Sequence, residues 1–195
     1  MHMGSVPYAM KTLQEKYGDD MHDGDIFILN DPFDGGMHLP DIFVVQPVFV
    51  EHRHVAFSVA TAHHLDVGGR LPGSSACDNV EIFQDGLRIP WLKLYDRGKP
   101  SEAIFTLIRA NVRVPEMTLG DLQAELAACH VGRMGVLEIV KRYGVETFEQ
   151  CARDMLDYTE RLVRADIAAW PDGTSTFTDY MDSGGSSESP DPVRI

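Results

Sequence analysis

The sequence predicts an α+β fold, with a mixed or antiparallel sheet in the first half of the chain and a long helical pair in the C-terminal half. Short apolar, β-branched runs recur up to residue 95 and are separated by stretches rich in glycine and proline. After residue 118 the apolar residues instead recur every three or four positions over two long segments. At 195 residues, 44% of them hydrophobic, the chain can form one substantial core.

The first half is expected to contain one helix and four strands. Met10, Leu13 and Tyr17 recur at helical spacing and predict a helix over 6–17, ended by Gly18. The strands are short apolar runs, and the second and third are separated by only four polar residues, which predicts a hairpin. The predicted strands are 25–29, 42–50, 55–62 and 91–95.

The second half is expected to be mainly helical. Thr118 can cap a helix that runs to Tyr143 and is closed by Gly144, and a second helix is predicted from about 147 to 169. The alternating segment 174–181 predicts a further strand. A new strand after a helical pair indicates part of a larger domain. We therefore expect one domain over 1–182, followed by a polar, flexible tail over 183–195.

Charge and composition exclude some classes of protein. The formal net charge of −13 argues against nucleic acid as a partner, since nucleic acids bind basic surfaces. No apolar run approaches the roughly 20 residues that a membrane span requires, so no membrane partner is expected. The three widely spaced cysteines, with no CxxC pair, are typical of free thiols in a reducing compartment. The predicted location is the cytoplasm.

Two short segments combine imidazoles with carboxylates. His38 and Asp41 flank a bend at Leu39-Pro40, and His63, His64 and Asp66 follow the third predicted strand. Imidazole and carboxylate together suit a divalent ion such as zinc, manganese or iron. The predicted hairpin brings the two segments together, because the first precedes one strand and the second leaves the other. The sequence therefore predicts a metal-centred active site.

The ligand set has open alternatives at this stage. Adjacent residues of an extended chain point to opposite faces, so only one of His63 and His64 can face a shared site directly. The other is expected to orient ligands or to face substrate, and Asp66 could accept the free N–H of an imidazole. Three protein ligands suffice for catalytic zinc. Manganese or iron would require further oxygens, for example from Asp31 or Asp34.

Simpler interpretations exist for the same residues. An isolated pair such as His38 and Asp41 can be a surface histidine beside a turn-stabilising carboxylate. Glu81 and Asp85 could be acid/base or substrate-binding groups, or ordinary charged loop residues. The sequence has no P-loop and no GxGxxG motif.

The combination of motifs resembles the hydantoinase B/oxoprolinase (HyuB-type) family. The similar segments extend from residue 2 to about 182, and their combination is more specific than any one of them. They are 24–33 (GDIFILNDPF), 35–41 (GGMHLPD), 62–69 (AHHLDVGG), 72–74 (PGS), 81–90 (EIFQDGLRIP), 111–113 (NVR) and 120–122 (GDL).

The resemblance implies a metal-dependent subunit of an ATP-dependent cyclic amide hydrolase, of the N-methylhydantoinase or 5-oxoprolinase type. A HyuA-like, ATP-binding partner subunit would activate a small cyclic amide by phosphorylation, and the HyuB-type subunit would open the ring within a hetero-oligomer. The family's metal ligands fall on His38, Asp41 and His63. His64 and Asp66 are then candidate catalytic residues that orient ligands or substrate.

Two alternatives remain within this resemblance. The chain could be a subunit of an ATP-dependent ketone carboxylase of the acetone or acetophenone type, which the family also contains. Family members are longer at both ends, and a further carboxylate ligand lies upstream of the segment that this chain matches. We therefore expect an internal portion of such a subunit or a shortened relative, and a truncated, non-catalytic interaction module is the third interpretation.

Overall fold

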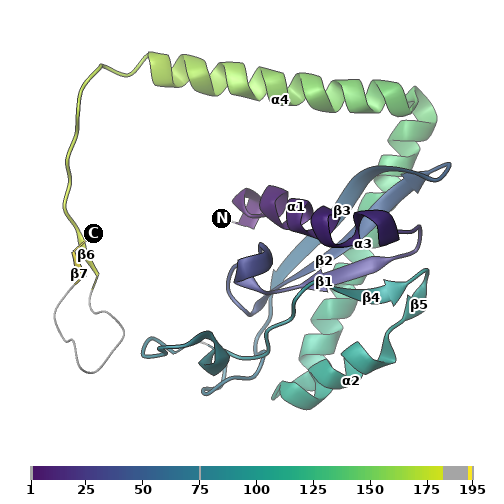
Figure 1. Cartoon of the computed structure of the whole chain (residues 1–195), viewed down its shortest axis with the longest axis vertical. Helices are drawn as coiled ribbons and strands as arrows, with labels where there is room; N and C mark the ends of the chain where they lie inside the picture. Colours follow the sequence, from purple (N-terminus) through teal and green to yellow (C-terminus); the bar gives the residue numbers. More distant parts are fainter. Residues whose placement is uncertain (1, 75, 182–192, 195) are drawn as a thin grey trace. The chain divides into compact units, whose positions relative to one another are not determined.

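The described part of the chain has an α+β fold, as the sequence predicts, with four α-helices and a five-stranded antiparallel sheet (Figure 1). The computed structural model describes residues 2–74, 76–181 and 193–194. These divide into two compact units, with the boundary between Leu137 and Glu138. The predicted division into a domain over 1–182 and a tail stays a prediction.

The main sheet has the strand order β3-β2-β1-β4-β5, and every neighbouring pair is antiparallel. The predicted hairpin of β2 and β3 is present, and its pairing extends to Asp41 at the start of β2 and to His63 at the end of β3. The turn is shorter than the four residues expected, since Val50 pairs with Arg53 and only Glu51 and His52 lie between them. Both turn residues adopt positive φ, which is typical of two-residue hairpin turns. The strands are β1 (Ile26–Leu29), β2 (Asp41–Val50), β3 (Arg53–His63), β4 (Leu92–Asp96) and β5 (Lys99–Pro100).

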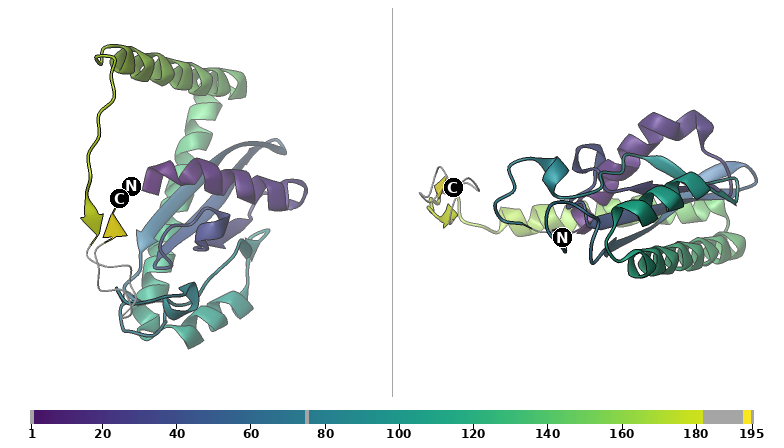
Figure 2. Two further views of the ribbon diagram at one scale, coloured as in Figure 1. Left: turned by 60° about the vertical axis from the view of Figure 1, so that its left-hand side comes forward. Right: turned by 90° about the horizontal axis from the view of Figure 1, so that it is seen from below.

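Both faces of this sheet are covered, which explains why its strands read as continuous apolar runs (Figure 2). Helix α1 (Val6–Tyr17) packs on one face through Ala9 and Leu13. Helix α2 (Glu102–Asn111) and the first part of α3 (Pro115–Tyr143) cover the other face. The sheet separates two apolar cores, and successive residues of each strand point alternately into one core and the other. Phe27, Leu29, Phe43 and Val45 face α1, whereas Ile28, Ile42, Val44 and Leu94 face α2 and α3.

Two helical features differ from the sequence prediction. Helix α2 was not predicted, although Ile104, Phe105 and Ile108 carry helical spacing over its ten residues. Helix α3 begins at Pro115, before the expected cap. The Thr118 hydroxyl donates to the backbone carbonyl of Asp66, 3.3 Å away, so this side chain fastens a loop onto the helix. Proline is well suited to the first helical turn, which explains the earlier start.

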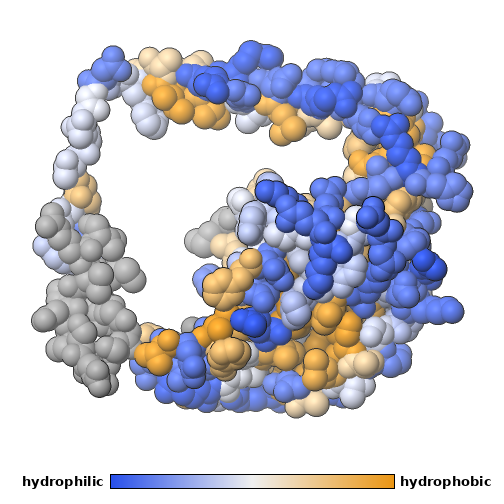
Figure 3. Space-filling model, viewed as in Figure 1, coloured by the Kyte–Doolittle hydropathy of each residue, from blue (hydrophilic) through white to orange (hydrophobic). Residues whose placement is uncertain are grey.

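The second unit contains the end of α3, helix α4 (Val145–Ala168) and a two-stranded pairing. Gly144, with φ of +86°, separates the two long helices, as predicted. Within α4 no residue is buried, and apolar side chains such as Met155 and Leu162 are exposed. Apolar patches along this helix are visible in Figure 3.

Of the strand predicted over 174–181, only β6 (Tyr180–Met181) forms; it pairs with β7 (Val193–Arg194). The rest of the predicted tail, residues 183–192 and 195, lies outside the described residues. Cys77, Cys129 and Cys151 are free thiols. No helix in the described part of the chain combines the length and apolarity needed to cross a bilayer.

The loop that leads toward the predicted metal segment is docked on α1. Gly35 has φ of +108°, and a Cβ atom on it would lie 2.5 Å from the Cα of Ala9. The Thr12 hydroxyl also donates to the Asp34 carbonyl of this loop, at 2.5 Å. The loop can therefore approach the helix only with glycine at position 35.

Gly35→Ala should lower the free energy of unfolding by roughly 2–5 kcal/mol, since a left-handed backbone and a steric clash add together. Gly98→Ala is the matched control. Gly98 has φ of +81° but open space around its Cβ position, so only the backbone cost of about 1 kcal/mol applies. Urea denaturation measures both variants, and equal losses would show that the contact with α1 is unimportant.

Candidate metal centre

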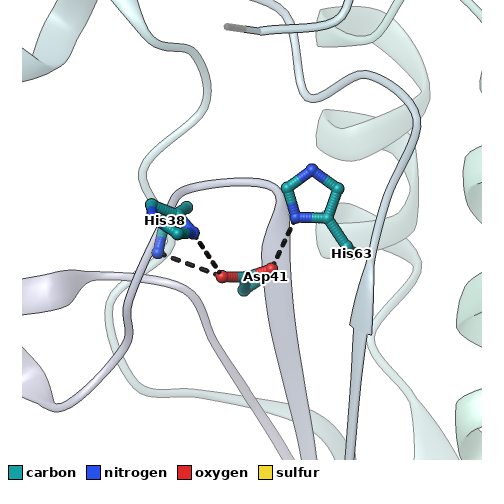
Figure 4. A group of neighbouring side chains, drawn as sticks. All are labelled: His38, Asp41 and His63. Carbon is teal, nitrogen blue, oxygen red and sulfur yellow. Dashed lines mark hydrogen bonds and ion pairs between the residues drawn. The ribbon is translucent and has the colours of Figure 1, made fainter. Parts of the chain in front are cut away.

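The structure brings His38, Asp41 and His63 together at one end of the β2–β3 hairpin (Figure 4). Asp41 and His63 are directly opposite each other in the strand register. Nδ1 of His63 lies 2.6 Å from Oδ1 of Asp41, and Nδ1 of His38 lies 2.9 Å from Oδ2. The Asp41 side chain is fully buried, while the side chains of His38 and His63 are 67% and 62% exposed. A buried carboxylate thus lies between two accessible imidazoles.

The bend before β2 is fixed by its own hydrogen bonds. The Asp41 amide donates to the His38 carbonyl at 2.9 Å, and the Ile42 amide donates to the Pro40 carbonyl at 3.1 Å. The His38 amide also donates to Oδ2 of Asp41, at 3.3 Å. Proline at position 40 restricts the chain to a turn here. The spacing of three residues therefore places both side chains of the motif on one side of a tight turn.

The two adjacent histidines point to opposite faces of the sheet. His63 lies beside Asp41, whereas His64 is fully buried, with Nε2 3.0 Å from Oε2 of Glu125 on α3. Burial raises the pKa of the Glu125 carboxyl, and the hydrogen bond with His64 offsets part of this rise. The sequence left open which of the two histidines faces the shared site, and in the structure it is His63 that lies beside Asp41.

Asp66 has different partners from those expected. Instead of an imidazole, its buried carboxylate accepts backbone N–H groups from Gly68, Gly73 and Arg113 at 2.9, 2.9 and 3.1 Å. The guanidinium of Arg113 adds a bond of 2.8 Å to Oδ2. Burial raises the pKa of Asp66, but the hydrogen bonds have the larger combined effect and lower the pKa to about 2. Asp66 is therefore an ionised anchor for the loop that follows His64.

The donor set fits a divalent cation. His38, Asp41 and His63 each offer a ligand atom, and these atoms lie within 4.8 Å of one another. Two imidazoles and one carboxylate suit zinc, manganese or iron. Asp31, one source considered for the further oxygens that manganese or iron would need, is not in this group of converging residues; its carboxylate accepts the Phe33 amide and lies 3.3 Å from Arg88.

A cavity of about 300 Å³ opens beside the two imidazoles. Its walls combine apolar side chains, including Leu39 and Ile82, with the carboxylate of Asp85. Asp85 accepts a hydrogen bond from the Asn79 side chain through Oδ1. Of the two acidic residues noted in this segment, Asp85 thus lines the same cavity as His38 and His63.

Two residues that contact the predicted site residues were not identified from the sequence. They are Glu125, the partner of His64, and Arg113, the partner of Asp66. Glu125 did leave a signal, because it lies on the same face of α3 as the buried Leu122, Leu126 and Cys129. A carboxylate within an apolar helical stripe indicates a buried partner. Arg113 lies in the segment 111–113, which contributes to the family resemblance. Its contacts with the loop after His64 span more than 40 residues, so spacing did not indicate its role.

Known proteins resemble this chain over nearly all of its length. The hydantoinase B/oxoprolinase family profile matches residues 1–195. The caprolactamase subunit beta of Pseudomonas jessenii is 35% identical over 185 residues, which cover 95% of this chain and 32% of that protein. The acetophenone carboxylase delta subunit of Aromatoleum aromaticum (strain DSM 19018 / LMG 30748 / EbN1) is 30% identical over 186 residues, 95% of this chain and 27% of that subunit.

A solved structure is similar as well. The crystal structure of ATP-dependent caprolactamase from Pseudomonas jessenii superposes with a TM-score of 0.83 at 35% identity, over 89% of this chain and 31% of that chain. The chain therefore spans about a third of the length of the relatives that it matches.

Asp66→Asn should lower the free energy of unfolding near pH 7 by roughly 2 kcal/mol, the equivalent of moving the pKa from 3.8 to about 2. Because the folded-state pKa is lowered, this stabilisation is present above pH 3.8 and is lost as the pH falls toward 2. Asparagine does not titrate, so the free energy of unfolding of the variant should not show this part of the fall below pH 3.8. Denaturant unfolding at a series of pH values measures both effects.

Asp78→Asn is the control for this experiment. Asp78 also pairs with an arginine, Arg70, but at an exposed position where solvent screens the pair. Its substitution should change stability little, and an equal loss in both variants would contradict the anchoring role of Asp66.

Proposed function

The chain belongs to the hydantoinase B/oxoprolinase family, and we propose that it forms the metal-binding part of an ATP-dependent cyclic amide hydrolase. The observation that carries the proposal is the convergence of His38, Asp41 and His63 beside a cavity. His38, Asp41 and His63 hold a divalent ion. When bound, such an ion supplies Lewis-acid chemistry, which polarises an amide carbonyl.

The cavity suits a compact ring. Its volume of about 300 Å³ is at the small end of ligand pockets, and Leu39 and Ile82 offer apolar surface to ring methylenes. Asp85 is the carboxylate on this wall that can accept a hydrogen bond from an amide N–H. A hydantoin or a lactam presents both features. His38 and His63 then orient the carbonyl side of the ring, and Asp85 orients its nitrogen.

The partner and the use of ATP belong to the same proposal. The matched relatives are named as subunits, and the solved caprolactamase is named as ATP-dependent. We infer a hetero-oligomer in which a HyuA-like subunit uses ATP to activate the ring and this chain completes the opening. The cytoplasmic location stays a prediction.

A ketone carboxylase subunit is the second candidate, favoured by the identity with the acetophenone carboxylase delta subunit. The same three ligands and the same cavity would then serve carboxylation of an activated ketone. A third candidate is a non-catalytic interaction module, since the chain spans about a third of its relatives. Metal content and the requirement for bicarbonate separate the three.

His38→Ala should abolish retention of divalent metal, because one of three protein ligands is lost. The side chain of His38 is 67% exposed, so the fold should be preserved. His52→Ala, in the β2–β3 turn, is the matched control and should retain the metal. Elemental analysis after dialysis without chelator measures both variants. Full metal content in His38→Ala would contradict the ligand assignment, and none in the wild-type chain would favour the non-catalytic module.

Ring opening by the assembled complex should require ATP and should proceed without bicarbonate, since ATP-dependent hydrolysis consumes ATP and water but no bicarbonate. Turnover of a five-membered cyclic imide or lactam is measured with bicarbonate removed and then restored. Hydrolysis predicts equal rates in both conditions. Turnover of a ketone that begins only on restoring bicarbonate would instead establish the carboxylase alternative.

A further inference from the structure

The end of β3 is tied to helix α3 by a buried pair. The side chains of His64 and Glu125 are 0% and 5% exposed, and Nε2 of His64 lies 3.0 Å from Oε2 of Glu125. These residues are 61 positions apart in sequence. The neighbours of Glu125 on this face of α3, Leu122 and Leu126, pack in the apolar core. A directional polar contact therefore replaces apolar packing at one point of the interface.

The backbone of His64 also holds the bend that carries His38 and Asp41, the two proposed ligands besides His63. Its backbone amide donates to the carbonyl of Pro40 at 2.8 Å. His64 follows His63 and Pro40 precedes Asp41, so this bond joins the two segments of the metal centre. A rotation of residue 64 would move the backbone on both sides of the centre at once.

We propose that Glu125 is a positioning residue for the metal centre, acting through His64 to hold His63 in register with Asp41. This inference rests on the proposed function, because it concerns the geometry of the same three ligands. Glu125 is placed on the opposite face of the sheet from the imidazole of His63. It therefore acts on the orientation of the strand end and not on the cation itself.

Stability alone does not account for the pair. Burying two ionisable side chains carries a desolvation penalty, and apolar residues of similar volume at such positions are often as stabilising or more so. Nδ1 of His64 also has no hydrogen-bond partner among the described residues, which adds to the cost. A hydrogen bond fixes the rotation of a side chain and its backbone in a way that apolar contact does not.

The test replaces both members by leucine, His64→Leu with Glu125→Leu. Apolar replacement should preserve or raise thermal stability. The affinity for Co²⁺, measured by titration with the visible spectrum as readout, should fall about 10- to 100-fold, as for other residues that orient metal ligands. The d–d bands should also change, because the ligand geometry is less constrained. A purely structural role predicts unchanged affinity and spectrum.

Single variants keep the test decisive if the double variant does not fold. Glu125→Gln retains a side-chain oxygen at the same reach, so Co²⁺ affinity should stay within about threefold of wild type. Glu125→Asp withdraws the carboxylate by one methylene and should lower the affinity about tenfold. Leu122→Ala is the control, since it destabilises the same face of α3 by about 2–5 kcal/mol without touching His64.

The outcomes are distinct. Weaker binding in the double variant and in Glu125→Asp, with near-normal binding in Glu125→Gln and in folded Leu122→Ala, supports the positioning role. Equal affinity in Glu125→Asp and wild type overturns it, as does an equal loss in folded Leu122→Ala. If the wild-type chain itself binds no Co²⁺, the proposed function fails, and the positioning role fails with it.

Discussion

The register of the β2–β3 pairing is the constraint on which the metal centre depends. Asp41 is opposite His63, and because side chains alternate along a strand, both point to the same face of the sheet. A slip of one residue would place His64 opposite Asp41 and send His63 to the other core. The two-residue turn at Glu51 and His52 pairs Val50 with Arg53, and an irregularity between Val48 and Phe49 then shifts the pairing by one residue. Turn and irregularity together set the register that places Asp41 opposite His63.

The surrounding fold reinforces that register from both sides. On one face α1 holds the loop before the bend, through the close approach of Gly35 to Ala9. On the other face α3 reaches the end of β3 through Glu125. The strands are apolar on both faces because each face is covered by helices, so a slipped strand would exchange one set of core residues for another. The site is thus held between two cores and is not carried on a free loop.

Local patterns explain which features were predictable from sequence. The hairpin and the long helices depend on spacing within a few residues, and both are present in the structure. The two segments that combine imidazoles with carboxylates were recognisable in the same way, and His38, Asp41 and His63 do lie together; that they bind a metal stays a prediction. Helix α2 was missed because its signal is only ten residues long. The segment 174–179 alternates but is not assigned to a strand, so alternation alone was insufficient. Glu125 and Arg113 act across 61 and 47 residues, and sequence spacing does not identify their partners. The apolar stripe around Glu125 indicates only that a buried partner exists.

The exposure of His38 and His63 is what the proposed catalytic role would require of ligands to a bound ion. Structural zinc sites are normally closed by four protein ligands, whereas catalytic sites keep a position open. Among the described residues three donors converge, and two of them line a cavity. The buried carboxylate of Asp41 is the fixed point, held by the bend and by the strand pairing. The accessible imidazoles of His38 and His63 face the space that a substrate would enter, so binding and chemistry would meet at the same edge of the sheet.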